Sequence, residues 1–389
     1  MKRWKILALL LALALCACGR EGAEPDSVPE PPPPQADAQP LSWDQLAWDR
    51  RLELDYAQSF SAEYAENGFA RIVIGQEAYL LVPEGMEPPA DTPAEITVLR
   101  RPLQNIYLQA TAAMDCFRQL DAIEAITLSG TQAEGWYIEE ARQAMEDGKI
   151  AYAGKYSAPD YELILSQGCG LALTSTMIYH TPEVKEQLER FGVPVLVERS
   201  SYESHPLGRM EWIKLYGVLL GKEAEAEAYF DRQLEKLAPV LEQENTGRTI
   251  AFFYITSNGA VSVRKSGDYI AKAIDLAGGV YALQDLTDEE NALSTMNIQM
   301  ETFYQEARDA DVLIYNSAID ADLETISQLV DKSAPLADFK AVQNGNVWCT
   351  GKSMFQESQA VGDIILDIHA ILAEEPPPDE ALTYLHRLA

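Results

Sequence analysis

The 389-residue sequence has little cysteine, little histidine and little positive charge. No CxxC spacing occurs, so the sequence encodes neither a disulfide framework nor a zinc site, and Cys116, Cys169 and Cys349 are interpreted as small buried residues. The four histidines form no HxxxH or HExxH, which disfavours capture of a bare metal ion. With 30 Lys and Arg against 61 Asp and Glu, the formal charge is −31, and the chain lacks the basic footprint that nucleic acids require.

Apolar runs long enough to span a membrane are also missing from the N-terminus. The run from Ile6 to Leu15 is far below the roughly 20 residues of a spanning helix, and it follows a short basic segment, which is typical of a signal peptide. The letters LCAC, residues 15–18, resemble a lipobox. We therefore predict a signal peptide over 1–17 and lipid modification of Cys18, because bulky Leu15 fits poorly before Cys16. An ordinary cleaved secretory signal is the alternative.

A spacer is predicted over residues 18–42. It is rich in Pro, Glu and Ala, so it buries too little surface to fold and its prolines hold it extended. Stable anchoring takes more than one acyl chain, and the acidic surface is repelled by anionic headgroups. We expect an extracytoplasmic protein that is attached to the membrane by its lipid only.

The remaining sequence alternates between strand and helix patterns, which predicts an α/β fold with parallel sheets. We expect an N-terminal lobe over 43–221 with a β-rich lead-in at about 51–92, and a C-terminal lobe over 246–389. The expected strands of the N-terminal lobe begin near residues 96, 125, 150, 171 and 193. Its expected helices cover 105–120, 136–147, 160–167 and 182–191.

A long helix is predicted over 222–245, between the lobes. Phe230, Leu234, Leu237 and Leu241 form one apolar stripe on it. The fold class is therefore expected to be two Rossmann-like lobes joined by a single long spine helix, with a ligand cleft between them. A helix packed within one lobe is the alternative.

This organisation resembles the periplasmic-binding-protein family, and within it the class that serves importers of ferric siderophores, haem and cobalamin. The segments that carry the resemblance are GKYSAPDYELIL (154–165), RSSYESHPLGRMEWIKLYGVLLGKE (199–223), METFYQEARDADVLIYN (300–316) and FKAVQNGNVWCTGKSMF (339–355). The resemblance implies a monomeric receptor of an ABC importer, with little lobe closure because one stiff helix joins the lobes. It implies binding of a metal chelate, with a ferric siderophore as the first expectation and haem or cobalamin as alternatives. A surface hydrolase or adhesion module is a more distant alternative, and no cofactor is expected.

Open α/β sheets place ligands at the carboxyl ends of their strands. Aromatic faces suit a broad ligand, and arginine suits oxygen groups, although each residue could equally be structural. His205 or Tyr202 could also coordinate the iron of haem, and Arg209 could pair with Glu203 or Glu211. The candidate ligand residues are Ser129, Trp136, Tyr156, Ser175, Tyr179, Arg199, Tyr202, His205, Arg264, Tyr269, Tyr315, Asn316 and Phe355.

One glutamate in each lobe is expected to dock the permease. In the family, such a glutamate pairs with permease arginines, and by position these residues are Glu162 and Glu301. Each opens a predicted helix, so the alternative is an acid that merely interacts well with the helix dipole.

Overall fold

The computed structural model describes residues 41–287, 295–320 and 322–389. The predicted signal peptide and Cys18 therefore lie outside the described residues. Within the described part, no helix is both long enough and apolar enough to cross a membrane.

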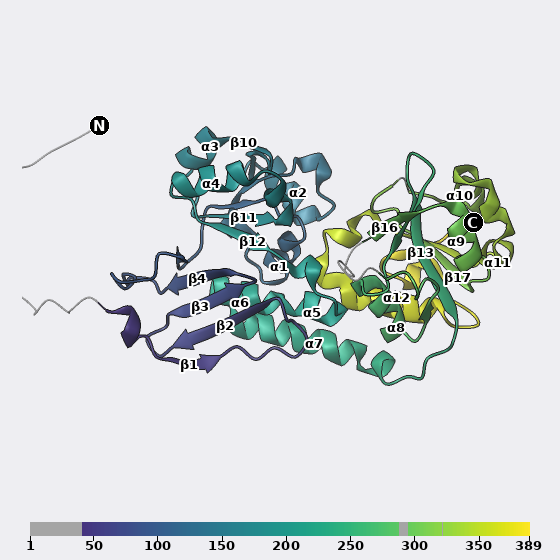
Figure 1. Cartoon of the computed structure of the whole chain (residues 1–389), viewed down its shortest axis with the longest axis horizontal. Coiled ribbons are helices and arrows are strands. Elements are labelled where there is room, and N and C mark those ends of the chain that lie inside the picture. Colours follow the sequence, from purple (N-terminus) through teal and green to yellow (C-terminus); the bar gives the residue numbers. More distant parts are fainter. Residues whose placement is uncertain (1–40, 288–294, 321) are drawn as a thin grey trace, which may run out of the picture. The chain divides into compact units, whose positions relative to one another are not determined.

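The described chain begins with a five-stranded sheet, which we call the N-terminal sheet (Figure 1). Its strands pair in chain order, antiparallel except for β4 and β5. They are β1 (Trp48–Arg51), β2 (Phe60–Ala65), β3 (Ala70–Ile74), β4 (Glu77–Val82) and β5 (Ile96–Arg100). In β3, buried Ala70, Ile72 and Ile74 alternate with half-buried residues, so one face lies on the core. The strand expected near residue 96 thus belongs to this sheet and not to the parallel sheet that follows.

The second sheet is entirely parallel and has the order β12-β11-β6-β7-β8. The helix expected over 105–120 is wrong at its start, because Ile106–Leu108 forms the central strand β6 and the helix begins at Ala113. All three residues of β6 are buried, so they show no period-2 pattern. The strands are β6 (Ile106–Leu108), β7 (Ile126–Ser129), β8 (Ala151–Tyr152), β11 (Leu171–Ser175) and β12 (Val195–Glu198), with a separate hairpin of β9 (Gly154–Lys155) and β10 (Ala158–Pro159). The helices are α1 (Ala113–Gln119), α2 (Glu139–Glu146), α3 (Tyr161–Ser166) and α4 (Pro182–Arg190).

Three helices follow: α5 (Pro206–Glu211), α6 (Ile213–Leu220) and α7 (Glu223–Leu241). The long helix expected over 222–245 is α7. It lies along α6 and also contacts α12, where Leu237 faces Gly362 and Lys236 forms an ion pair with Asp363 (Figure 1). Helix α7 therefore touches elements that come before and after it in the chain.

The third sheet has the order β16-β14-β13-β17-β18-β19, with β15 added beside β13. Strand β13 is parallel to β17 and β15, and β17 is parallel to β18. The strands are β13 (Thr249–Ile255), β14 (Val261–Arg264), β15 (Val280–Tyr281), β16 (Thr295–Ile298), β17 (Val312–Tyr315), β18 (Val347–Thr350) and β19 (Leu385–Arg387). The helices are α8 (Tyr269–Leu276), α9 (Met300–Ala307), α10 (Ile326–Lys332), α11 (Lys340–Gln343) and α12 (Val361–Ile371). The outer strands β14, β16 and β19 pair antiparallel, so this sheet is mixed. The predicted α/β class is confirmed, with a parallel sheet before α7 and a sheet with a parallel centre after it.

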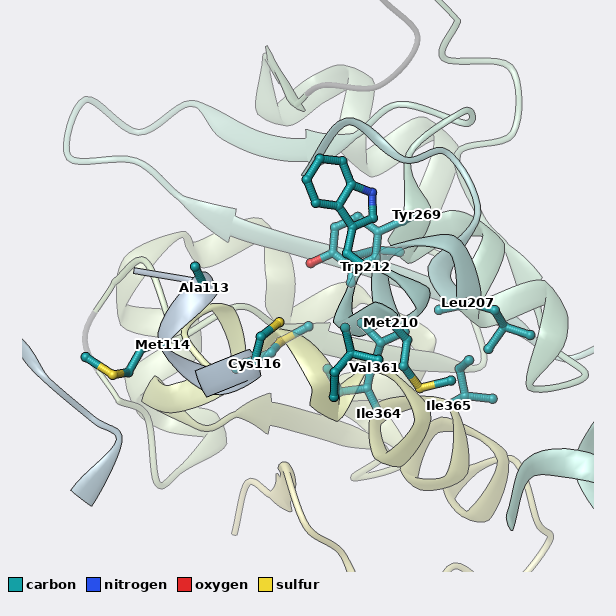
Figure 2. Packing of buried hydrophobic residues seen from close by; sticks show 14 of the residues in the cluster. Ala113, Met114, Cys116, Leu207, Met210, Trp212, Tyr269, Val361, Ile364 and Ile365 are labelled. Carbon is teal, nitrogen blue, oxygen red and sulfur yellow. The ribbon is translucent and has the colours of Figure 1, made fainter. Parts of the chain in front are cut away.

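One hydrophobic core runs through all three sheets. It extends in sequence from Ala57 to Leu388, and α1, α5, α8 and α12 meet in it. Figure 2 shows Met210 of α5 beside Ile364 of α12. Because burial of apolar area is the main stabilising contribution, the N-terminal sheet is an integral part of the folded body.

Candidate functional site

Three of the candidate ligand residues line one pocket of about 810 Å³. Tyr179 lies in the short 3₁₀ helix η4 (Thr176–His180) after β11, Arg199 follows β12 directly, and Tyr202 ends η5 (Ser200–Tyr202). Strands β11 and β12 are parallel neighbours, so their carboxyl ends bring these side chains to one edge. We call this cavity the Arg199 pocket, and its volume is in the range of small-molecule sites.

The opposite wall of the Arg199 pocket comes from the N-terminal sheet and was not predicted. The start of β2 and the turn from β3 to β4 supply it, far from Arg199 in sequence. No local sequence signal identifies this contact. These wall residues are Gln58, Ser59, Phe60, Ser61, Val73, Gly75, Gln76 and Glu77.

Arg199 is a charged residue of the pocket without an ion-pair partner among the described residues. Its guanidinium carbon lies 5.6 Å from the ring centroid of Tyr202, yet within the described residues its side chain has no hydrogen bond or ion pair. The one pocket carboxylate, Glu77, is already engaged, because Lys185 Nζ lies 2.9 Å away and Tyr79 donates to it at 2.8 Å. A free guanidinium in a concave site can bind an oxygen anion through two hydrogen bonds.

The two pocket tyrosines are accessible. Tyr179 is 47% exposed and Tyr202 is 40% exposed, and the hydroxyl of Tyr202 lies 3.1 Å from Thr176 Oγ1. Partial burial raises the pKa of Tyr179, so its phenol stays protonated at neutral pH. Both rings therefore offer an apolar face and a hydroxyl to a ligand.

Two buried carboxylates fix the wall that faces Arg199. Glu211 accepts hydrogen bonds from the backbone N–H groups of Asp55, Tyr56 and Ala57 at 2.8 to 2.9 Å. Glu203 does the same for the next two residues, Gln58 and Ser59, and also accepts from Trp212 Nε1 at 2.9 Å. The segment that enters β2 is thus held from the side of α5.

The prediction that Arg209 could pair with Glu203 or Glu211 is wrong, because backbone amides occupy those carboxylates. The Arg209 guanidinium instead lies 4.0 Å from the ring centroid of Tyr269, and its buried Nε has no partner in the described residues. This cation–π contact joins α5 to α8. Tyr269 is 4% exposed and so serves packing.

A second group of candidates lies around the third sheet. Arg264 faces Phe355 at 5.2 Å and Tyr269 at 5.8 Å, and it pairs with Asp268 at 3.3 Å. Arg264 and Asn316 line a cavity of about 110 Å³, which has room for about three water molecules at ~30 Å³ each. The Asn316 Oδ1 atom is buried and receives no hydrogen bond from the described residues, so water is the natural occupant.

The other candidates have internal roles or partial exposure. Ser129, Trp136 and Tyr315 are buried, and Trp136 Nε1 donates to Ser129 Oγ at 3.2 Å. The side chain of Trp136 therefore turns back toward its own strand end, and Tyr315 donates to Asp320. Tyr156 and Ser175 are half-buried.

His205 caps helix α5. Its Nδ1 accepts from the N–H of Leu207 at 3.2 Å, its ring stacks on Tyr56 at 5.0 Å, and burial lowers its pKa. No group of three or more His, Cys, Asp and Glu in the described residues could hold a metal ion. Cys116 and Cys349 are buried free thiols, as expected, and Cys169 is a half-buried one.

Glu162 and Glu301 are both exposed in the first turns of α3 and α9. Neither carboxylate has a hydrogen bond or ion pair to any described residue. Both are therefore free to meet a partner, and the docking role stays a prediction.

Comparison with known proteins gives one family match and many similar folds. Residues 127–353 match the family described as periplasmic binding protein. An uncharacterized lipoprotein of Methanocaldococcus jannaschii is 26% identical over 248 residues, which is 62% of this chain and 56% of that protein. The chain spans about half the length of the curated relatives that it matches.

Two solved structures illustrate the fold similarity. A periplasmic haem-binding protein of Pseudomonas aeruginosa has a TM-score of 0.56 at 15% identity, covering 74% of this chain and 98% of its own. The periplasmic catecholate-siderophore-binding protein VctP of Vibrio cholerae has a TM-score of 0.55 at 13% identity, covering 70% of this chain and 95% of its own. The N-terminal sheet lies before the first residue of the family match.

Proposed function

Because the chain belongs to the periplasmic binding protein family, as its sequence predicted, we propose that it is the lipid-anchored receptor of an ABC importer for a metal chelate, with a ferric siderophore as the first candidate. The receptor captures the chelate outside the cytoplasm and delivers it to the permease. A matched relative is named a lipoprotein, which supports the anchor at Cys18. A solved protein of the same fold is named for a catecholate siderophore, which supports this ligand class.

The observation that carries the proposal is the Arg199 pocket. Its guanidinium has no hydrogen bond or ion pair to any described residue, and two exposed tyrosines line the same pocket. A siderophore complex presents carboxylate, catecholate or hydroxamate oxygens around a bulky, partly aromatic body. Arginine binds such oxygens, and tyrosine rings cover the body.

Haem and cobalamin are the alternatives within the same receptor role. The haem propionates are carboxylates that Arg199 could bind, and Tyr179 or Tyr202 could approach iron, as tyrosine does in some haem proteins. His205 is poorly suited to coordinate metal through Nδ1, because this atom accepts the capping hydrogen bond from Leu207. A visible spectrum of the haem complex distinguishes tyrosine from histidine ligation.

The test is a panel of fluorescence titrations on the full-length, detergent-solubilised chain. The probes are ferric enterobactin, ferric citrate, ferrioxamine B, haemin, cyanocobalamin and molybdate. Trp136, one of the candidate ligand residues, and Trp212 are both buried, but Trp212 packs edge-on against Phe60 of the pocket wall at 5.0 Å. Energy transfer from Trp212 to a coloured chelate should therefore give saturable quenching.

We expect at least one iron chelate to bind with a Kd of about 1 µM or tighter. Uptake of that chelate in cells should then require both this chain and its permease. Saturable binding of haemin or cyanocobalamin alone would move the ligand to the alternatives. Absence of binding to every probe would contradict the receptor proposal.

A further inference from the structure

We propose that the N-terminal sheet is a ligand-binding element, and that it holds Arg199 in position to bind an anionic, oxygen-rimmed group of the ligand. This inference rests on the proposed receptor function and narrows it to anionic chelates. The sheet lies before the family match, which begins at residue 127, so the match does not include the second wall of the pocket.

The N-terminal sheet and its adjoining turns provide most of the residues that line the pocket. Eight of the eleven lining residues lie between Gln58 and Glu77, and only Tyr179, Arg199 and Tyr202 come from the second sheet. Four of these eight residues have uncharged polar side chains: Gln58, Ser59, Ser61 and Gln76. Amide and hydroxyl groups of this wall can donate to ligand oxygens without adding a competing charge.

The turn at Gly75 gives the guanidinium its position. A Cβ atom placed on Gly75 would lie 2.8 Å from Arg199 Nη1, so Arg199 rests against bare backbone at this point. Gly75 has φ +60, a left-handed conformation that glycine adopts without strain. A larger residue at this turn would push the guanidinium out of its place.

The charges of the pocket select the sign of the ligand. Glu77 is paired with Lys185, which also contacts Glu189 at 3.1 Å, whereas Arg199 has no hydrogen bond or ion pair to any described residue. Arg199 is therefore the charged group of the pocket that remains available to a ligand. An anionic group gains charge-assisted hydrogen bonds there, whereas a cationic chelate meets an uncompensated like charge.

The wall is also rigid before ligand arrives. The backbone N–H groups of residues 55–59 are bound to Glu203 and Glu211, and Tyr79 of β4 reaches across to the carbonyl oxygen of Val195 at 3.3 Å. A prepositioned wall loses little conformational entropy on binding. The geometry therefore describes a preformed anion subsite and not a surface that assembles around its ligand.

The main experiment compares two glycines of the same sheet. Gly75→Ala and Gly85→Ala place Ala in the same left-handed conformation, because their φ angles are +60 and +76, but nothing lies within 4 Å of a Cβ at Gly85. The two variants should lose similar stability. Only Gly75→Ala and Arg199→Gln should weaken binding of trianionic ferric enterobactin, by about 10-fold to 100-fold. Any affinity for monocationic ferrioxamine B should not fall.

A second pair of substitutions introduces no backbone strain. Gln76→Glu keeps the size of an exposed lining side chain and adds a carboxylate to the pocket, while Gln167→Glu adds the same charge at an exposed site elsewhere. Gln76→Glu should weaken ferric enterobactin and Gln167→Glu should not. Thermal unfolding of each variant establishes that it is folded.

The outcomes separate this inference from the receptor proposal. If Arg199→Gln weakens binding but Gly75→Ala and Gln76→Glu bind like the parent chain, the sheet is not a ligand element although the receptor proposal stands. If no chelate binds but iron-free citrate or molybdate binds in an Arg199-dependent way, the anion subsite is supported and the chelate receptor fails. If none of the anionic probes binds, this inference is wrong, and if no probe of the whole panel binds, the receptor proposal is wrong as well.

Discussion

Removal of the Glu211 carboxylate should weaken the attachment of the N-terminal sheet to the rest of the protein. Glu211 is completely buried and accepts three backbone hydrogen bonds from Asp55, Tyr56 and Ala57. It also pairs with Lys214 at 3.2 Å, and Lys214 is only 6% exposed. Glu211→Ala therefore removes the counter-ion of buried Lys214, which keeps only the carbonyl oxygen of Glu53 at 3.3 Å as a hydrogen-bond acceptor among the described residues, and leaves three amide donors without their acceptor.

The expected loss can be worked out from these contacts. Breaking a buried ion pair by removing one partner costs about 3–5 kcal/mol, because the other charge stays buried. Of the three amides, only Ala57 belongs to a buried residue, and an unsatisfied buried N–H adds about 1–3 kcal/mol. The amides of Asp55 and Tyr56 are left out of the sum because water can reach them. We expect a total loss of about 4–8 kcal/mol for Glu211→Ala.

Urea denaturation followed by circular dichroism measures this loss through the transition midpoint. Glu211→Gln should lose less than Glu211→Ala, because one oxygen is retained, but it places an NH₂ group against N–H donors. Glu235→Ala is the control, since Glu235 is exposed on α7 and an exposed change usually stays within about 0.5 kcal/mol.

Amide hydrogen exchange gives a readout specific to this mechanism. In Glu211→Ala, residues 55–57 should lose protection more than Gln58 and Ser59, whose amides remain on Glu203. A Glu211→Ala variant within 1 kcal/mol of the parent chain, or uniform loss of protection across the protein, would refute the reasoning.

Three further predictions concern the anchor, the docking surface and pH. Cys18→Ala should release the chain from membranes washed with carbonate, whereas Cys16→Ala should not. Glu162→Lys and Glu301→Lys should each leave chelate affinity unchanged, because both residues are exposed, yet uptake should collapse if they face permease arginines. Burial lowers the pKa of His205 below 6.5, so the neutral ring contributes stability above that pH and the contribution is lost on acidification. His205→Asn, which retains capping ability, should therefore show a smaller fall in melting temperature between pH 7 and pH 5.

The fold could be predicted wherever a pattern is local. The apolar stripe of Phe230 and Leu237 identified α7, because helical periodicity depends only on residues that are close together in the sequence. Pairing of strands is not local, so β5 was assigned to the wrong sheet. The central strand β6 was mistaken for helix because all of its three residues are buried and a short apolar run carries no period.

The same distinction applies to the candidate site. Tyr179, Arg199 and Tyr202 were identified because they follow strands whose carboxyl ends must share an edge. The wall opposite them could not be found, since Gly75 meets Arg199 only through packing of the two sheets. Trp136 was misplaced at the mouth because sequence does not show that its indole donates to Ser129.

Besides α7, a second set of contacts joins the part of the chain before α7 to the part after it, and these contacts limit motion of the two parts relative to each other. The side chain of Gln356 accepts a hydrogen bond from the N–H of Tyr137 at 2.8 Å and donates to the carbonyl oxygen of Gly135 at 2.7 Å. Close by in sequence, the N–H of Gln359 donates to buried Asp115 at 2.8 Å. If the parts of the chain before and after α7 were joined only through α7, they could rotate relative to each other about several axes. Because they are joined at two separate places, only rotation about the axis through both places remains. Large closure around a ligand would break these hydrogen bonds, so affinity has to come from preformed surfaces such as the Arg199 pocket, whose walls are already fixed by buried carboxylates.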